Sequence, residues 1–421
     1  MPAITSVQGR LLFNSRGNKT IEVEVTSDNK FVGRVCAPSG ASVGKHEVQS
    51  FPSNNPVQAL NVLMENAHRF IGVDSSNQQE IYNILRKIDA SPDYGVLGGA
   101  AAFAVSIAAL ESCSKASAEP MFRMLSKSKS KSKSKSYRFP FPLGNVLGGG
   151  AHAGPGSPDI QEILVSAIGA NKIDEAIAMN FKVHQRVGKE IEAIDPRFAY
   201  GKGDEGAWAP NIDNDKAIDI VEKAIINCGF VLGKEMCMGI DFASSSLWND
   251  KTKRYEYTRQ GISRTRQEQV DFVNDLISRY KLFYVEDPVN EDDFDSMALI
   301  TKRNKTCLVT GDDMLVTNAS LVNKAANEGA CSGAILKVNQ AGSLYESLLF
   351  ANECCRNNIK IITSHRSGES TDPHISHIAI GTNSVLLKTG VMGGERVSKL
   401  NELLRISEYG LIEGMAEIPF G

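Results

Sequence analysis

Residues 282–286 read Leu-Phe-Tyr-Val-Glu, and this pattern, an apolar run that ends in one ionisable residue, decides the fold. Six such runs occur in the C-terminal two-thirds of the chain, and they end at Asp241, Glu286, Asp312, Lys337, His365 and Lys388. The intervals are 45, 26, 25, 28 and 23 residues, about the period of buried strands that alternate with helices. Parallel strands covered on both faces read as continuous apolar runs, and functional residues at their C-terminal ends are typical of a (β/α)8 barrel. The series predicts an α/β, TIM-like barrel with its active site on one rim.

The first 125 residues predict a separate α+β domain. Residues 4–13, 20–26 and 31–37 favour three strands of a β-meander, and the second alternates apolar and polar side chains in period two. Residues 56–120 show apolar side chains at helical spacing. The stretch 38–44, which carries Ser39, is small and hydroxyl-rich, so it is either a mobile loop or a plain surface loop.

A strict alternation of lysine and serine separates this domain from the barrel. Residues 126–136 contain five lysines and no apolar side chain, so they cannot bury apolar area and are expected to be disordered or an exposed loop. A basic tail for RNA or an anionic surface is the alternative. The predicted division is 1–125 for the N-terminal domain, 126–138 for the linker and 139–421 for the barrel.

Global composition excludes some classes of partner. The net charge is −3, and the chain is 42% apolar and 23% charged, as is ordinary for a soluble globular protein. We therefore expect no nucleic acid and no membrane among its partners. The N-terminus has no signal-peptide pattern, and the eight cysteines include no Cys-x-x-Cys pair, which indicates reduced thiols and a cytoplasmic location.

Three further segments carry polar groups into the barrel region. The glycine-rich stretch 148–154 contains His152, but it is neither a P-loop nor a dinucleotide fingerprint because the required spacings are absent. Glu162 comes directly before an apolar run rather than after one. Glu205 lies in Gly203-Asp204-Glu205-Gly206, an acidic segment flanked by glycines.

The residue types on the predicted rim indicate a particular chemistry. A single acid at a strand end is usually a helix cap or a surface charge, but six ionisable residues in succession favour one site. Carboxylates from Asp241, Glu286 and Asp312 would form an oxygen-only site, which selects Mg²⁺ or Mn²⁺ rather than zinc. Two lysines on the same rim suggest an anionic substrate, and a lysine becomes a base where neighbouring positive charge lowers its pKa. Metal-assisted removal of a proton next to a carboxylate fits this set.

Motifs along nearly the whole chain resemble the enolase family, whose members dehydrate 2-phosphoglycerate in glycolysis. The segments that carry the resemblance are Ser15-Arg16-Gly17-Asn18, Ser39-Gly40-Ala41-Ser42-Val43-Gly44, Gly203-Asp204-Glu205-Gly206, Glu286-Asp287-Pro288, Leu336-Lys337-Val338-Asn339-Gln340, Ser364-His365-Arg366-Ser367-Gly368-Glu369 and Lys399-Leu400-Asn401-Glu402-Leu403-Leu404-Arg405-Ile406. The resemblance implies a homodimer or larger homo-oligomer that interconverts 2-phosphoglycerate and phosphoenolpyruvate.

The same resemblance implies the ligands of two Mg²⁺ ions per active site. Asp241, Glu286 and Asp312 would hold the first. Ser39, on its own mobile loop, would help to bind the second ion, which arrives with the substrate. Closure of that loop would exclude water from the reacting groups.

Catalytic and substrate-binding roles are implied residue by residue. Lys337 would remove the proton from C2. Glu205, with Glu162 beside it, would assist departure of the C3 hydroxide as general acid, and His365 would support the site. The residues that would bind the substrate are Lys388 at its carboxylate, Arg366 and Ser367 at its phosphate, and His152 on a loop that closes over it.

Some positions depart from the family pattern. Asn14 and Lys19 stand where the family has Asp and Pro, and two prolines alter the segment after His152. His374 and His377 suggest either a metal pair or an ordinary helical or loop surface. Two other functions stay open: a related enzyme that acts on a different acid, and a non-catalytic scaffold that keeps the fold.

Overall fold

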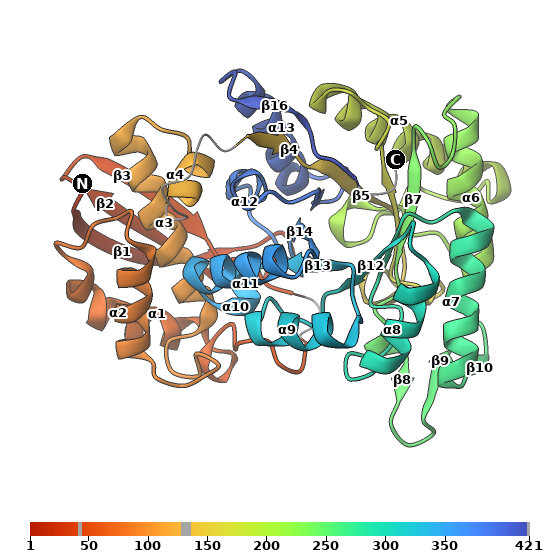
Figure 1. Cartoon of the computed structure of the whole chain (residues 1–421), viewed down its shortest axis with the longest axis horizontal. Helices are drawn as coiled ribbons and strands as arrows, with labels where there is room; N and C mark the ends of the chain where they lie inside the picture. The colour runs from red at the N-terminus through yellow and green to blue at the C-terminus, as the bar shows by residue number, and fades with distance from the viewer. Residues whose placement is uncertain (41–43, 128–135, 419–421) are drawn as a thin grey trace.

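The computed structural model describes residues 1–40, 44–127 and 136–418. It confirms the predicted fold class, with an N-terminal α+β domain beside a closed barrel of eight strands (Figure 1). Residues 128–135 of the Lys/Ser run and 41–43 of the Ser39 loop lie outside the described residues, so the predictions for them are not addressed. The domain bounds 1–125, 126–138 and 139–421 stay predictions.

The N-terminal domain places one buried helix on a small sheet. Strands β1 (Ile4–Phe13), β2 (Lys19–Ser27) and β3 (Phe31–Cys36) pair antiparallel in chain order. The helices that follow are α1 (Pro56–Asn66), α2 (Gln78–Ile88), α3 (Gly99–Ser117) and α4 (Met121–Lys127). A Cβ on Gly33 would lie 2.0 Å from the carbonyl oxygen of Ala108, so α3 packs backbone to backbone against β3. No helix among the described residues is long and apolar enough to cross a membrane.

The barrel closes in the order β11-β12-β13-β14-β15-β5-β6-β7. Its strands are β5 (Phe141–Gly148), β6 (Glu162–Ser166), β7 (Cys237–Asp241), β11 (Tyr284–Glu286), β12 (Leu308–Gly311), β13 (Gly333–Leu336), β14 (Lys360–Ser364) and β15 (Leu386–Lys388). The helices of the barrel region are α5 (Ile173–Ile194), α6 (Asn214–Asn227), α7 (Arg266–Tyr280), α8 (Phe294–Arg303), α9 (Ala319–Glu328), α10 (Val338–Ala341), α11 (Leu344–Arg356), α12 (His374–Thr382) and α13 (Gly394–Ser407). Most barrel strands are buried along their whole length, which explains their continuous apolar runs.

One strand runs against the predicted parallel order. β6 pairs antiparallel with both β5 and β7, whereas the remaining neighbours in the barrel pair parallel. The connection from β5 to β6, which is described throughout, contains the short 3-10 helix Gly150–His152 and no α-helix of the kind that usually links parallel strands, and the chain turns back to pair beside β5. The reversal brings Glu162, the first residue of β6, opposite Asp241, the last residue of β7. A carboxylate that precedes its apolar run therefore reaches the same rim as those that follow theirs.

Two small sheets complete the fold. β8 (Trp248–Asn249), β9 (Arg254–Tyr257) and β10 (Ile262–Arg264) form an antiparallel meander between β7 and α7, which accounts for the long interval from Asp241 to Glu286. β4 (Tyr137–Phe139) pairs with β16 (Ile412–Met415) outside the barrel.

Candidate active site

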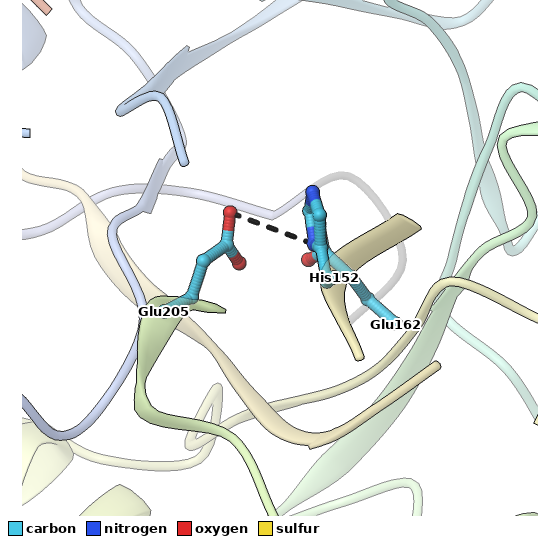
Figure 2. A group of neighbouring side chains, drawn as sticks. All are labelled: His152, Glu162 and Glu205. Carbon is cyan, nitrogen blue, oxygen red and sulfur yellow. Dashed lines mark ion pairs between the residues drawn. The ribbon is translucent and has the colours of Figure 1, made fainter. Parts of the chain in front are cut away.

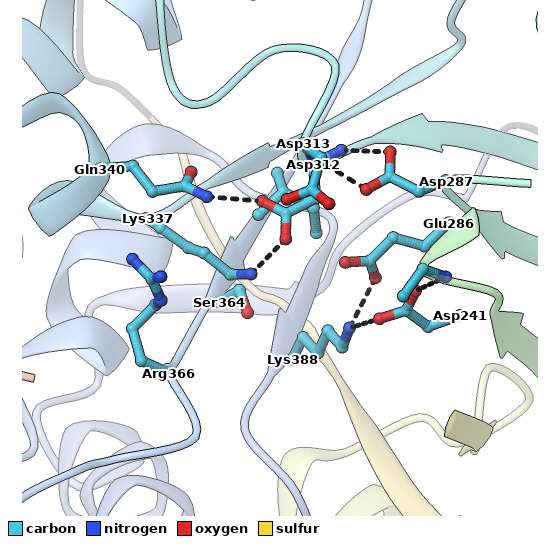
Figure 3. A network of polar contacts seen from close by, with 12 residues as sticks. Asp241, Glu286, Asp287, Asp312, Asp313, Lys337, Gln340, Ser364, Arg366 and Lys388 are labelled. Atoms are coloured by element: carbon cyan, nitrogen blue, oxygen red, sulfur yellow. Dashed lines mark hydrogen bonds and ion pairs between the residues drawn. The ribbon is translucent and has the colours of Figure 1, made fainter. Parts of the chain in front are cut away.

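The strand ends gather the predicted residues on one rim of the barrel (Figure 3). Asp241, Glu286 and Lys388 are the last residues of β7, β11 and β15, and Asp312, Lys337 and His365 directly follow β12, β13 and β14. Of these six, all but Glu286 line a single pocket, together with His152, Glu162, Glu205, Arg366 and Ser367. The free volume of this pocket is about 30 Å³, room for about one water molecule, because the charged side chains fill it.

Lys388 is the centre of one group of charges. Its ammonium Nζ lies 2.9 Å from Asp241, 2.7 Å from Glu286 and 3.3 Å from Glu162. All four side chains are buried. Burial alone would lower the pKa of Lys388, but the surrounding carboxylates outweigh it and raise that pKa well above its ordinary value. The lysine is therefore a fixed cation at this end of the pocket.

Lys337 belongs to a second group across the pocket. Its ammonium pairs with Asp312, and the other oxygen of that carboxylate accepts a hydrogen bond from Gln340 Nε2 at 3.0 Å. Burial opposes the charge on Lys337, but the carboxylate of Asp312 dominates and raises the pKa of the amine. Lys337 is therefore protonated as it stands, and it becomes a base only where Asp312 is neutralised by another cation.

This rim holds more buried carboxyl groups than the two lysines can neutralise, and the carboxyl groups in excess retain their protons. Burial, and then the neighbouring Asp241, raise the pKa of Glu286 to about 8, and its Oε1 has no hydrogen-bond partner among the described residues. Burial and the carboxylates of Asp313 and Asp312 likewise raise the pKa of Asp287 well above its ordinary value. A hard divalent cation fits this donor set, because it would compensate the charge and use the free oxygen.

Two sets of three side chains in the described part of the chain bring possible ligand atoms within 4.8 Å of one another. They are Asp287, Asp312 and Asp313, and His152, Glu162 and Glu205. The trio expected to bind the first metal ion is not among them, since an ammonium group stands between its members. Asp287 is committed elsewhere, because its carboxylate accepts hydrogen bonds from the backbone of Asp312 and Asp313 at 3.0 and 2.8 Å.

Glu162, His152 and Glu205 form the other side of the pocket (Figure 2). His152 Nδ1 lies 3.3 Å from Glu162 and 3.9 Å from Glu205. Burial would lower the pKa of His152, but these two carboxylates raise it to about 9, so the imidazole is a cation at neutral pH. Burial, and then the negative charge of Glu205, raise the pKa of Glu162. Burial also opposes ionisation of Glu205, but the imidazoles of His365 and His152 hold its pKa well below the ordinary value.

The backbone that presents Glu205 is tightly constrained. Glu205 has φ of +65° within the 3-10 turn Asp204–Gly206, and Gly206 has φ of +74°. A Cβ on Gly206 would lie 2.0 Å from the carbonyl oxygen of Met392, so only glycine fits there. The carbonyl of Gly206 is bound by His184 Nε2 of α5 at 2.8 Å. The turn is therefore fixed from two sides, as expected where a strained residue serves a site.

Arg366 and Ser367 form the basic and hydroxyl part of the pocket. The Arg366 guanidinium is held by both oxygens of Glu47, at 2.6 and 3.2 Å, and by Asn339. Ser367 Oγ is buried and has no hydrogen-bond partner among the described residues. Ser39 pairs with Gly368 through two backbone hydrogen bonds, and Asn14 Nδ2 donates to its hydroxyl at 2.9 Å. Ser39 thus lies beside the Arg366 segment, but it does not line the pocket itself.

Two polar residues of this region gave no signal in the sequence: Glu47 and Arg396. Arg396, on α13, is 1% exposed and contacts His365 Nδ1 at 2.9 Å. Gln340 belongs to the segment 336–340 and lines the pocket itself, whereas the side chains of Glu47 and Arg396 orient charged groups of the pocket from outside it. No regular spacing relates them to the strand ends, so only the tertiary structure reveals them.

The surface interpretation of His374 and His377 is wrong. Both are buried in α12, where His374 faces Glu111 of α3 at 3.4 Å and His377 faces Glu402 of α13 at 3.0 Å. Neither belongs to a set of three close ligand atoms among the described residues. They instead join the barrel to the N-terminal domain and to α13.

Comparison with known proteins places this geometry in context. The family model described as enolase, C-terminal TIM barrel domain, matches residues 136–414, and the one described as enolase, N-terminal domain, matches residues 4–125. The chain is 42% identical to an enolase from Methanosphaera stadtmanae over 417 residues, which is 99% of each protein. It is 39% identical to an enolase from Methanothermobacter thermautotrophicus over 99% of each, and 38% identical to one from Pyrobaculum aerophilum over 95% of each.

Proposed function

The chain belongs to the enolase family, and from this premise we propose that it is a hydro-lyase that interconverts 2-phosphoglycerate and phosphoenolpyruvate. The observation that supports the reaction most is the position of two groups on opposite sides of one pocket. Lys337 follows β13 and Glu162 begins β6, four strands away in the closed order of eight, and all three of Lys337, Glu162 and Glu205 line the pocket. Loss of water across a carbon–carbon bond needs a base at one carbon and an acid at the next.

The proposed base is Lys337, which takes the proton from C2 of the substrate. That proton is weakly acidic because it lies next to a carboxylate, so the negative charge that develops must be compensated. Lys388, a fixed cation in this structure, pairs with the substrate carboxylate. The proposal is compatible with the raised pKa of Lys337, because the partner responsible is Asp312, a proposed metal ligand.

The proposed ligands of a first Mg²⁺ are Asp241, Glu286 and Asp312. When bound, this ion supplies the positive charge that compensates the substrate carboxylate and lowers the pKa of Lys337. Ser39 is the proposed ligand of a second Mg²⁺ that arrives with the substrate. The excess of buried carboxylates and the free oxygen of Glu286 support a cation here.

The proton that leaves with the C3 hydroxyl is proposed to come from the group Glu205, Glu162 and His152. Two nearby carboxyl groups whose pKa values are shifted in opposite directions often serve as an acid and a base. Here the pKa of Glu162 is raised and that of Glu205 is lowered, so Glu162 holds a proton more tightly. Glu205 is ionised at rest because its pKa is low, so it delivers the proton after receiving it from Glu162 or His152, and His152 closes over the substrate beside it. The short distances from His152 Nδ1 to the carboxylates of Glu162 and Glu205 support this position of His152.

The phosphate group is proposed to bind Arg366 and Ser367. Arg366 is pre-oriented by Glu47, and Ser367 offers a buried hydroxyl without a partner in the described residues. Because the pocket now has room for little more than one water molecule, substrate entry requires its charged side chains to separate. A cytoplasmic homo-oligomer completes the proposal and rests on the family resemblance alone.

Conversion of 2-phosphoglycerate by the purified protein tests the function. The product has a conjugated double bond, so its appearance is followed by ultraviolet absorbance with added Mg²⁺ and then with excess chelator. We expect turnover that stops on chelation, and no turnover of glycerate, which lacks the phosphate. A folded protein that binds Mg²⁺ and leaves 2-phosphoglycerate unchanged would contradict the proposal, and turnover of a non-phosphorylated acid would point to a related enzyme instead.

A further inference from the structure

Arg396 is a buried cation that contacts one side chain of the candidate active site, His365, and the backbone of the two residues after it. It lies in the first turn of α13, and its side chain is 1% exposed. Nη1 lies 2.9 Å from His365 Nδ1, and the guanidinium also donates to the carbonyl oxygens of Arg366 and Ser367, at 2.6 Å each. The guanidinium is therefore held in place by two backbone acceptors, and its Nε lies 3.4 Å from Glu395, while Nη1 also faces the imidazole.

The contact with Arg396 determines which nitrogen of His365 carries hydrogen. A guanidinium is permanently protonated and has no acceptor, so each of its nitrogens can only donate. His365 Nδ1 must therefore present a lone pair, which excludes both the Nδ1–H tautomer and the doubly protonated ring. The hydrogen lies on Nε2, and this nitrogen is 3.1 Å from Glu205 Oε1.

We propose that Arg396 is a positioning residue that fixes His365 as the neutral Nε2–H tautomer, so that the ring offers Glu205 a hydrogen-bond donor without a positive charge. This inference rests on the proposed role of Glu205 in expelling the C3 hydroxide. A neutral His365 has no proton to spare, so the proton that Glu205 delivers must come from the other side, where His152 and Glu162 lie. Arg396 thereby determines from which side Glu205 receives its proton.

The charges around His365 agree with a neutral ring. Burial lowers the pKa of this imidazole to about 4, and Arg396 lowers it too, whereas Glu205 and Glu369 oppose them. His152, on the far side of Glu205, has a pKa of about 9 because two carboxylates face it. The Glu205 carboxylate therefore lies between a charged imidazole, His152, and an uncharged one, His365. This difference in charge would be lost if both rings could be protonated.

The tautomer is measured directly by nitrogen NMR on the full-length protein with ¹⁵N-labelled histidine. A bare ring nitrogen resonates far downfield of one that carries hydrogen, and the His365 signals are assigned by their loss in His365→Gln. In the wild type we expect a bare Nδ1 and a protonated Nε2 from pH 8 down to about pH 5, where an unperturbed histidine is mostly doubly protonated. A hydrogen on Nδ1 in the wild type would overturn the inference without any variant, and this result does not depend on turnover of 2-phosphoglycerate.

A matched pair of variants separates this role from simple packing. Arg396 and Lys399 are both buried cations on α13 that bind carbonyl oxygens of the segment after β14, but Lys399 reaches Ser370 and does not contact His365. Arg396→Met should add hydrogen to His365 Nδ1 near neutral pH and lower turnover of 2-phosphoglycerate by about 10- to 100-fold. Lys399→Met should leave the His365 signals unchanged.

The conservative variant Arg396→Lys keeps one donor and should restore the wild-type tautomer in part. If Arg396→Met folds and leaves the His365 nitrogen shifts unchanged, Arg396 does not fix the tautomer. If the shifts change but turnover falls no more than in Lys399→Met, the tautomer has no role in the reaction. A wild type with the expected tautomer but no turnover would count against the proposed function and leave the assignment of the ring intact.

Discussion

The rim of the barrel has two parts that hold their side chains by different means. In the strand-end part, Asp241 and Glu286 end the neighbouring parallel strands β7 and β11, and Lys388 ends β15, three strands from β7 around the closed barrel, so the barrel backbone fixes their positions. In the loop part, His152 and Glu205 lie on 3-10 turns outside the parallel ladder. The first part is a densely paired set of charges, and the second depends on contacts from distant segments. The comparison teaches that the paired charges lie where the backbone is most regular, whereas the groups proposed to move a proton to the leaving hydroxide are positioned by tertiary contacts.

Removing the proposed base should have the largest effect. Lys337→Ala takes away the only group assigned to C2, so we expect turnover of 2-phosphoglycerate to fall by about 10²- to 10⁴-fold, or further. Lys360→Ala is the matched control, because Lys360 opens β14 at the opposite end of the barrel. Divalent-metal binding, measured by calorimetry with Mn²⁺, should survive in both variants. Near-normal turnover in Lys337→Ala would remove the lysine from the mechanism.

The contributions of His152 and His365 to stability should change with pH in opposite directions. His152 lies in the loop part of the rim, and His365 directly follows the barrel strand β14. Burial opposes protonation of His152, but Glu205 and Glu162 raise its pKa from 6.5 to about 9. The folded state therefore binds more protons than the unfolded chain between these values, and the stability that His152 contributes is full below pH 6.5 and lost as pH rises through 9. For His365, burial lowers the pKa from 6.5 to about 4, so its contribution is lost as pH falls from 6.5 towards 4.

Apparent melting temperatures of single variants measure this contrast. His152→Gln should be destabilised relative to the wild type most near pH 6 and least near pH 10, by about 3 kcal/mol at most for a shift of this size. The melting temperature of His365→Gln should rise relative to that of the wild type as the pH is lowered from 6.5 to 4. Parallel pH profiles for the two variants would contradict the assigned charges.

A smaller effect is expected from the contacts that hold the His152 loop. Arg259, in the turn between β9 and β10, donates to the carbonyl oxygens of Ser157, Pro158 and Gly150, at 2.8, 2.7 and 3.2 Å. Arg259→Met should free this loop and raise KM for 2-phosphoglycerate by about tenfold, since a hydrogen bond from a charged donor contributes about 1.5–3 kcal/mol.

Arg254→Met is the control for that variant, because Arg254 belongs to the same meander but binds Ser263 and Glu268 instead. It should change KM little. Equal kinetics in the two variants would show that the loop needs no support from this meander.

The strand-end part was predictable from sequence because each functional residue follows an apolar run at a regular interval. The position of Glu162 was predictable only in part: its place before an apolar run is the signature of the reversed strand β6, yet a wholly parallel barrel was expected. Glu47 and Arg396 left no periodic signal, since they reach the site from a loop and a helix turn. Burial of His374 and His377 was missed because a polar, proline-flanked segment reads as surface, whereas their partners Glu111 and Glu402 lie far away in the chain.

The division of labour between the two parts is tested most directly by exchange of the C2 hydrogen of 2-phosphoglycerate with solvent deuterium. The measurement is made by NMR on wild type, Lys337→Ala and Glu205→Gln, each with Mg²⁺ and alongside the assay of phosphoenolpyruvate. Glu205→Gln should form almost no product but still exchange the C2 hydrogen, whereas Lys337→Ala should do neither. Loss of exchange in Glu205→Gln together with retained exchange in Lys337→Ala would show that the base lies in the loop part, and the assignment of the two parts would be reversed.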